Sequence, residues 1–118
     1  RHPPLQKFTM DVLEQKHPAT AHLGKTWDWT DECYFFTNMA PGLKVLLALD
    51  VKSHKAPALQ KGGDKSDGRY PLAWCQEFDG GRQFYTALGH KIEYYSDPTF
   101  RKHILGGILW AMNEKPLP

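Results

Sequence analysis

A nearly continuous apolar run, LKVLLALDV at residues 43–51, sets the strongest limit on how this chain can fold. Its length is that of a β-strand, and the lack of polar alternation indicates a strand covered on both faces, as in a parallel α/β sheet. Such a strand needs parallel neighbours joined by crossover helices. The sequence offers one convincing helix and no βαβ unit before this run. We therefore expect a central strand here, with part of its sheet supplied from outside the chain.

The first half of the chain predicts one further strand and two long loops. Residues 5–14, LQKFTMDVLE, alternate apolar and polar side chains, which indicates a strand with one buried face. Residues 15–32 are rich in turn formers and contain Pro18 and Gly24, so they predict a long loop. Residues 52–71 have the composition of a surface loop, with little that could be buried.

The second half predicts a β-hairpin followed by a helix. LAWCQEF and RQFYTAL flank the turn signal DGG, which indicates a hairpin over residues 72–88. Beyond it, Ser96 or Asp97 can cap a helix that has Pro98 at its first position and runs over about 98–113. This helix is expected to pack on the sheet.

Two adjacent glycines, Gly106 and Gly107, interrupt the apolar pattern of this helix. Each costs about 1 kcal/mol relative to alanine in a helix, so the pair predicts a close approach to the hairpin or the strand beneath. The expected core contacts of the helix are Phe100, Ile104, Ile108 and Trp110. Residues 101–103, RKH, are expected on its wet face.

Composition limits which partners and chemistry the chain can have. A chain of 118 residues, 41% of them hydrophobic, suffices for one modest domain. Its net charge of +2 comes from charged residues dispersed along the chain, which argues against nucleic acid as a partner. No apolar run reaches the roughly 20 residues that a membrane helix needs. The composition is compatible with a homo-oligomer. Cys33 and Cys75 lie in aromatic, strand-like runs, which favours buried free thiols.

The segment GRQFYTALGH, residues 81–90, ends a strand-like run on Gly89 and His90. A histidine at a strand end can act as a general acid or base near neutral pH, hold a sugar hydroxyl or ligate a metal. The structural alternative is a histidine that is hydrogen-bonded to the backbone. We take His90 as the leading catalytic candidate.

Aromatic and acidic residues alternate in the segment TWDWTDECY. Trp27, Trp29 or Tyr34 could stack on the C–H face of a sugar, while Asp31 or Glu32 accept its hydroxyls or move a proton. Glu32 is the preferred acid. The alternative is that the tryptophans close the core and Asp31 caps a turn.

Three further residues are weaker candidates for ligand binding. His17 and His22 could converge on a cation with Asp31 or Glu32, but their spacing matches no strong metal signature. Arg82 could hold a substrate carboxylate, although a solvated charge at a sheet edge is the common fate of such a residue. Packing roles are expected for Trp74 and Tyr85.

Three segments of the chain resemble the ThuA-like family, named for trehalose utilisation. They are HPATAHLGKTWDWTDECYFF, VLLALD and PLAWCQEFDGGRQFYTALGHKIEYYSDPTFRKHILGGILWAM, and together they cover nearly the whole sequence. ThuA-like domains are about twice as long and share the doubly wound, flavodoxin-like α/β sandwich of the class I glutamine amidotransferases. The resemblance implies that residues 1–118 are the C-terminal part of a single, incomplete domain.

The resemblance also implies a place for the histidine. Class I amidotransferases carry their catalytic histidine at a strand end that precedes the C-terminal helix, and His90 is similar in order and spacing, with Gly89 allowing a sharp turn. Their nucleophile is a cysteine on a strand-to-helix elbow. ThuA-like proteins generally lack it, and neither Cys33 nor Cys75 lies on such an elbow. Glutamine amidotransferase activity is therefore not implied.

Two functions follow from the resemblance. The first is metabolism of trehalose-type disaccharides or oxidised sugars, with a small sugar as ligand and acid–base chemistry by His90 with Glu32 or Asp31. The second is a non-catalytic carbohydrate-binding or interaction module of a larger protein. The reaction, the compartment and a divalent metal cofactor stay open on this basis.

Overall fold

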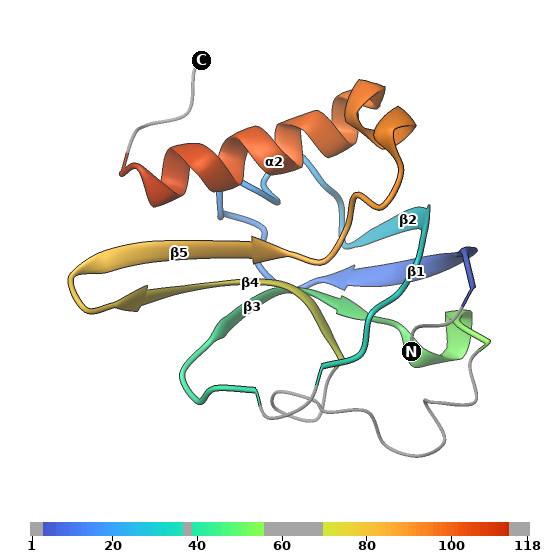
Figure 1. Ribbon diagram of the computed structural model, residues 1–118, viewed down its shortest axis with the longest axis horizontal. Coiled ribbons are helices and arrows are strands. Elements are labelled where there is room, and N and C mark those ends of the chain that lie inside the picture. The colour runs from blue at the N-terminus through green and yellow to red at the C-terminus, as the bar shows by residue number, and fades with distance from the viewer. Residues whose placement is uncertain (1–3, 37–38, 56–69, 114–118) are drawn as a thin grey trace.

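The computed structural model describes residues 4–36, 39–55 and 70–113, which form a sheet with one long helix across one face (Figure 1). The five strands are β1 (Gln6–Val12), β2 (Thr26–Asp31), β3 (Lys44–Leu49), β4 (Pro71–Phe78) and β5 (Gly81–Thr86). The long helix is α2 (Pro98–Ala111), and two short 3-10 helices are η1 (Val51–Ser53) and η2 (Ile92–Ser96). None of the helices in this part of the chain has the length and apolarity to span a membrane.

The sheet is antiparallel throughout, in the order β2-β1-β3-β4-β5. β3 is central, as the apolar run at residues 43–51 predicts, but its neighbours β1 and β4 are antiparallel to it, so the expectation of parallel pairing is wrong. The last four residues of β3 are all buried. A strand in the middle of an antiparallel sheet can also be covered on both faces, and that burial accounts for the apolar run without parallel neighbours.

The predicted strand in residues 5–14 is confirmed as β1, whereas β2 corrects the prediction of a loop over residues 15–32. The turn formers that indicated a loop occupy only the first part of that range. In β2, buried Trp27, Trp29 and Asp31 alternate with exposed residues, which is the period of a strand with one covered face. Most of the predicted loop over residues 52–71 lies outside the described residues.

The predicted hairpin and helix are both confirmed. β4 and β5 pair around Asp79 and Gly80, whose positive φ angles of 51° and 79° suit a tight hairpin turn. The Asp97 carboxylate accepts a hydrogen bond from the Phe100 amide at 2.9 Å, and Pro98 occupies the first turn of α2. The helix therefore begins where its sequence signal predicts.

The buried face of α2 differs from the expected one at two positions. Phe100 is fully buried, and Ile104 and Trp110 pack against the core as expected, but Ile108 is 48% exposed. His103, expected on the wet face, is fully buried. It bonds the Ala19 carbonyl oxygen through Nδ1 and the Thr86 hydroxyl through Nε2, so a hydrogen-bonded polar side chain takes a core position.

The two glycines of α2 confirm the predicted close approach. A methyl group on Gly107 would overlap the Phe84 ring of β5, and one on Gly106 would overlap the backbone at Pro18 and Ala19. The hairpin contact was expected, but the contact with the segment before β2 was not. α2 is thus held between β5 and that segment at a distance that only glycine permits.

Gly106→Ala should lower the free energy of unfolding by about 1–3 kcal/mol, because backbone atoms cannot move aside for the added methyl group. At an uncrowded helix position the same change would stabilise by roughly 0.5–1 kcal/mol. Denaturant unfolding measures the difference, with half-exposed Leu105→Ala as the control, expected within about 0.5 kcal/mol of the original protein. An equally or more stable Gly106→Ala protein would contradict the packing described.

Candidate functional site

The end of β2 and the segment after β5 meet, although these strands form opposite edges of the sheet. The Gly89 amide donates to Asp31 Oδ2 at 2.7 Å, and the His90 amide donates to Asp31 Oδ1 at 3.3 Å. Gly89 has a φ of +109°, and a side chain there would collide with the hydroxyl of Tyr95. Glycine therefore lets the chain turn around Asp31 and place His90 beyond it.

Asp31 is fully buried, and its carboxylate accepts four hydrogen bonds. Besides the two from Gly89 and His90, it accepts one from Trp29 Nε1 at 2.9 Å and one from the Glu32 amide at 2.8 Å. A buried carboxylate engaged in this way fixes the backbone on both sides of the site. We therefore assign Asp31 a positioning role and not the proton transfer proposed for it from the sequence.

His90 and Glu32 lie side by side. His90 Nδ1 is 3.1 Å from Glu32 Oε2, and the side chains are 43% and 14% exposed. The Tyr34 hydroxyl donates to the same Glu32 oxygen at 2.9 Å, and this hydrogen bond raises the pKa of Tyr34. One carboxylate oxygen thus contacts both an imidazole and a phenol at the protein surface. Such a group can orient the imidazole for proton transfer.

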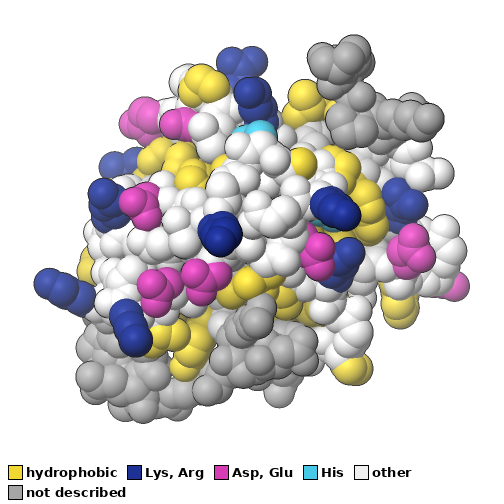
Figure 2. Space-filling model, turned by 180° about the vertical axis from the view of Figure 1, so that it is seen from behind, with side chains coloured by type: hydrophobic (Ala, Val, Ile, Leu, Met, Phe, Trp, Pro, Cys, Tyr) yellow, Lys and Arg dark blue, Asp and Glu magenta, His cyan; other side chains and the backbone are white. Residues whose placement is uncertain are grey.

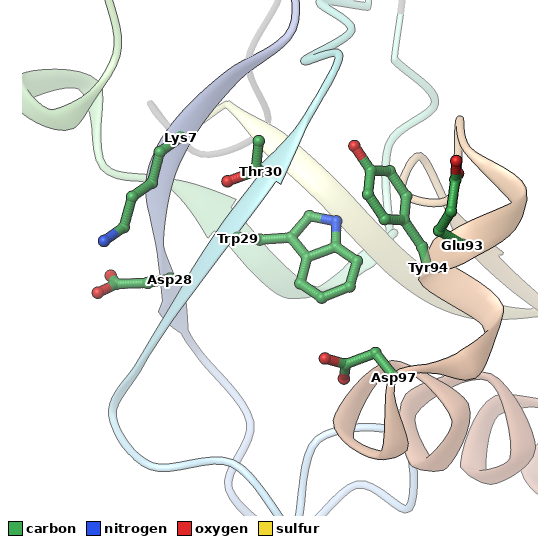
Figure 3. Close-up of a pocket in the computed structure, with 7 residues that line it drawn as sticks. All are labelled: Lys7, Asp28, Trp29, Thr30, Glu93, Tyr94 and Asp97. Atoms are coloured by element: carbon green, nitrogen blue, oxygen red, sulfur yellow. The ribbon is translucent and has the colours of Figure 1, made fainter.

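A pocket of about 280 Å³ lies between β2 and the segment from η2 to the start of α2 (Figure 3). Its lining residues are Lys7, Asp28, Trp29, Thr30, Glu93, Tyr94 and Asp97. In Figure 3 the indole of Trp29 lies between β2 and the η2–α2 segment. His90 and Glu32 do not line this pocket. Burial raises the pKa of Tyr94, with smaller contributions from Asp31, Glu93 and Glu32.

The two tryptophans proposed as sugar platforms lie in the core. Trp27 is 8% exposed and packs edge-on against His103 at 5.4 Å. Trp29 is 9% exposed, and its ring stacks on Phe100 at 5.3 Å. Neighbouring rings cover most of both side chains, so a core role describes them better than a sugar platform, and Trp29 keeps only a small exposed part at the wall of the pocket.

His17 and Arg82 lie together at the far end of α2, away from Asp97 and its neighbours. The His17 ring packs on Trp110 at 5.2 Å, and the Arg82 guanidinium lies 4.8 Å from the centre of that same indole. Burial lowers the pKa of His17 to about 4. His22 bonds the Thr99 carbonyl at 2.9 Å. Within the described ranges no three His, Cys, Asp or Glu side chains gather as a metal site would require.

Both cysteines are free and buried, as predicted. Burial, with a smaller effect of Asp31, raises the pKa of Cys33 to about 12, and burial raises that of Cys75. A thiol with a raised pKa is a poor nucleophile near neutral pH. Neither cysteine therefore has the environment of a catalytic thiolate.

The sequence interpretation missed a group of three aromatic rings. Trp74 and Tyr85, assigned to packing, stack on each other at 4.4 Å, and Phe36 stands edge-on to them at 5.1 and 5.7 Å. Tyr85 is 42% exposed. Counting residue pairs outward from the DGG turn would have placed Trp74 opposite Tyr85, as the strand register does. The signal was available, but it lay in strand pairing and not in a motif.

Acidic and basic side chains are interspersed over the described part of the face seen in Figure 2. No dense field of one sign covers the described part of this face.

Comparisons with known proteins agree with the resemblance. The family model ThuA, described as trehalose utilisation, matches residues 1–111. A putative ThuA-like protein from Bacteroides uniformis has 22% identity and a TM-score of 0.67 over 92% of this chain and 44% of its own. One from Parabacteroides merdae has 18% identity and a TM-score of 0.61 over 100% and 43%. No curated protein matches.

The chain therefore spans less than half the length of these solved relatives, and their likeness shows the fold. The family model, in contrast, covers nearly every residue from the first strand to the end of α2. That match includes the segment of Asp31 and Glu32 as well as the turn at Gly89 and His90. The chain belongs to the ThuA family.

Proposed function

We propose that this chain carries the acid–base group of a sugar-processing site, with His90 as the proton carrier and Glu32 as its partner. The observation that supports it is the 3.1 Å contact between His90 Nδ1 and Glu32 Oε2, on a histidine that stays 43% exposed. The family's link to trehalose utilisation suggests a trehalose-type disaccharide or an oxidised derivative as substrate.

The contact defines how the imidazole would work. A carboxylate oxygen beside Nδ1 favours the tautomer with its proton on Nδ1, which puts the lone pair on Nε2. Nε2 would then take a proton from a sugar hydroxyl and return it to a hydroxyl or carbonyl oxygen. Tyr34 steadies Glu32 through the shared oxygen, and Asp31 holds the His90 backbone. The pair thus combines an oriented base with a fixed support.

For the full-length protein we retain the proposal of a doubly wound, flavodoxin-like sandwich, of which residues 1–118 are one part. The support is that the chain covers 44% and 43% of the two solved relatives. The facing wall of the site would then come from residues outside this chain. Activity should accordingly be measured on the full-length protein.

His90→Asn in the full-length protein should lower kcat on trehalose or a keto derivative at least about 100-fold, because asparagine keeps a similar shape but cannot titrate. The melting temperature should change little, since the side chain is 43% exposed. Turnover is followed by product chromatography and stability by calorimetry. His22→Asn is the matched control, because that ring lies at the surface on the Thr99 carbonyl, and it should keep full activity.

Retention of turnover by His90→Asn would refute the acid–base role. If the same variant also bound sugar as tightly as the original protein, a non-catalytic carbohydrate-binding module would take its place. Glu32→Gln gives a second measure, with an expected loss of at least about tenfold in kcat, because the amide orients the imidazole less strongly than the carboxylate.

A further inference from the structure

We propose that Phe36, Trp74 and Tyr85, together called the aromatic corner, form a stacking subsite for the apolar face of a pyranose ring. It rests on the proposed function, and it assigns to that site the residues that bind the substrate ring. The aromatic corner shares no residue with the His90–Glu32 pair, so the two assignments can fail separately.

The rings of the aromatic corner meet in a defined arrangement. Trp74 and Tyr85 are nearly parallel, with 16° between their planes, while Phe36 is perpendicular to both at 90° and 88°. Trp74 and Tyr85 are cross-strand partners in the β4–β5 hairpin, so backbone pairing fixes their positions. A ligand would meet rings that are already placed, which reduces the ordering cost of binding.

The aromatic corner lies on the face of the hairpin opposite α2. Phe84 and Thr86, the chain neighbours of Tyr85, both contact that helix, Phe84 at Gly107 and Thr86 at His103. Because side chains alternate along a strand, Tyr85 points to the other face. It remains 42% exposed, although packing alone would favour covering so large a ring.

The chain after β2 connects the aromatic corner to the His90–Glu32 pair. Cys33 and Phe35 pack into the core, so in an extended segment Glu32, Tyr34 and Phe36 project to the opposite side. Phe36 contributes to the aromatic corner, and Glu32 contacts His90.

Tyr34 lies between them. It donates a hydrogen bond to Glu32 at 2.9 Å, and this bond is the main cause of its raised pKa, to which Tyr85 makes the smallest contribution. A ring held on Tyr85 would thus have hydroxyl donors and acceptors next to it in the direction of the base.

The arrangement favours a flat ring face over a compact cation. Aromatic cages for ammonium groups direct several ring faces at one point. Here Trp74 and Tyr85 cover one face of each other, and Tyr85 stays 42% exposed. A pyranose, with C–H groups on its face and hydroxyls around its rim, matches such a surface.

The test compares ligands that share hydroxyls but differ in having a ring. Cellobiose and the acyclic polyol sorbitol are titrated into the full-length protein, with aromatic proton shifts and calorimetry as readouts. Cellobiose should bind and shift the Trp74 and Tyr85 signals, and sorbitol should not. Equal binding of sorbitol, or displacement of cellobiose by choline, would overturn the proposal.

Tyr85→Ala should raise the Kd for cellobiose, and KM for the substrate, at least about tenfold with kcat nearly unchanged, because stacking contributes to binding and not to proton transfer. Phe78→Ala, which removes an aromatic ring 65% exposed on the same hairpin, is the matched control and should bind normally. Tyr85→Phe keeps the ring face and should bind within about threefold of the original. Equal Kd values for Tyr85→Ala and Phe78→Ala would refute the subsite.

If Tyr85→Ala does not fold, a saturation-transfer experiment on the unmodified protein tests the subsite instead. Saturation of the Tyr85 ring protons should then be transferred to the C–H protons of bound cellobiose. Absence of that transfer would refute stacking. His90→Asn should retain cellobiose binding. Its turnover tests the acid–base proposal alone, so failure of that proposal and failure of the subsite give different results.

Discussion

Replacing Asp31 by alanine should lower the free energy of unfolding by at least about 3 kcal/mol, enough to unfold a marginally stable domain. The carboxylate is fully buried and accepts four hydrogen bonds, from Trp29 Nε1 and from the amides of Glu32, Gly89 and His90. Alanine leaves the buried Trp29 donor and three partly buried amides unpaired, and an unpaired buried donor costs about 1–3 kcal/mol, although the costs do not simply add.

Two further variants make this expectation specific. Asp31→Asn keeps the shape but replaces one accepting oxygen by a donor, so its loss should be intermediate. Asp28→Ala removes an exposed carboxylate of the same strand, bonded to the Thr9 hydroxyl, and should change stability by no more than about 0.5 kcal/mol. Urea unfolding measures all three. Similar losses for Asp31→Ala and Asp28→Ala would contradict the role given to Asp31.

The protein should lose stability as the pH falls from about 6.5 to about 4. Burial lowers the pKa of both His17 and His103 to about 4, against an ordinary value of 6.5. Between these values the unfolded chain binds more protons than the folded one, so the free energy of unfolding rises with pH. The contribution is complete above about pH 6.5. Over this window each histidine accounts for about 2–3 kcal/mol.

His103→Gln separates the contribution of His103 to this pH dependence from that of His17. Glutamine can still bond the Thr86 hydroxyl but does not titrate, so unfolding free energies measured from pH 7 to 4.5 should show a slope reduced by nearly one proton. Its loss of stability relative to the original protein should shrink as the pH falls. A full slope in this variant would exclude His103 as the source.

The elements predicted best from the sequence are those specified by neighbouring residues. The β4–β5 hairpin depends on Asp79 and Gly80, and the start of α2 depends on the Asp97 cap, each a local interaction. β2 was missed because its alternation in TWDWTD was interpreted as site chemistry. The antiparallel pairing of β3 could not be predicted, because burial on both faces gives the same apolar run in either kind of sheet.

The candidate site also has parts that were predicted from the sequence and parts that were not. The sequence interpretation paired His90 with Glu32 or Asp31 as acid–base partners, and the structure places His90 Nδ1 3.1 Å from Glu32 Oε2. The buried role of Asp31 was not predicted, since it depends on the two edges of the sheet meeting, which is a property of its tertiary curvature. His17 and Arg82 were proposed for the site, but they lie at the other end of α2, where both side chains contact the Trp110 ring.

The hydrogen bond between Asp31 and Gly89 joins residues that are 58 positions apart in the chain. Closing so long a loop is entropically costly and is repaid only when the strands between have paired. The histidine and its carboxylate can therefore meet only late in folding, after the intervening strands have formed their register. No partly folded intermediate that lacks one of these strands would hold the contact between His90 and Glu32, so the proposed acid–base chemistry would begin only once the whole sheet has formed.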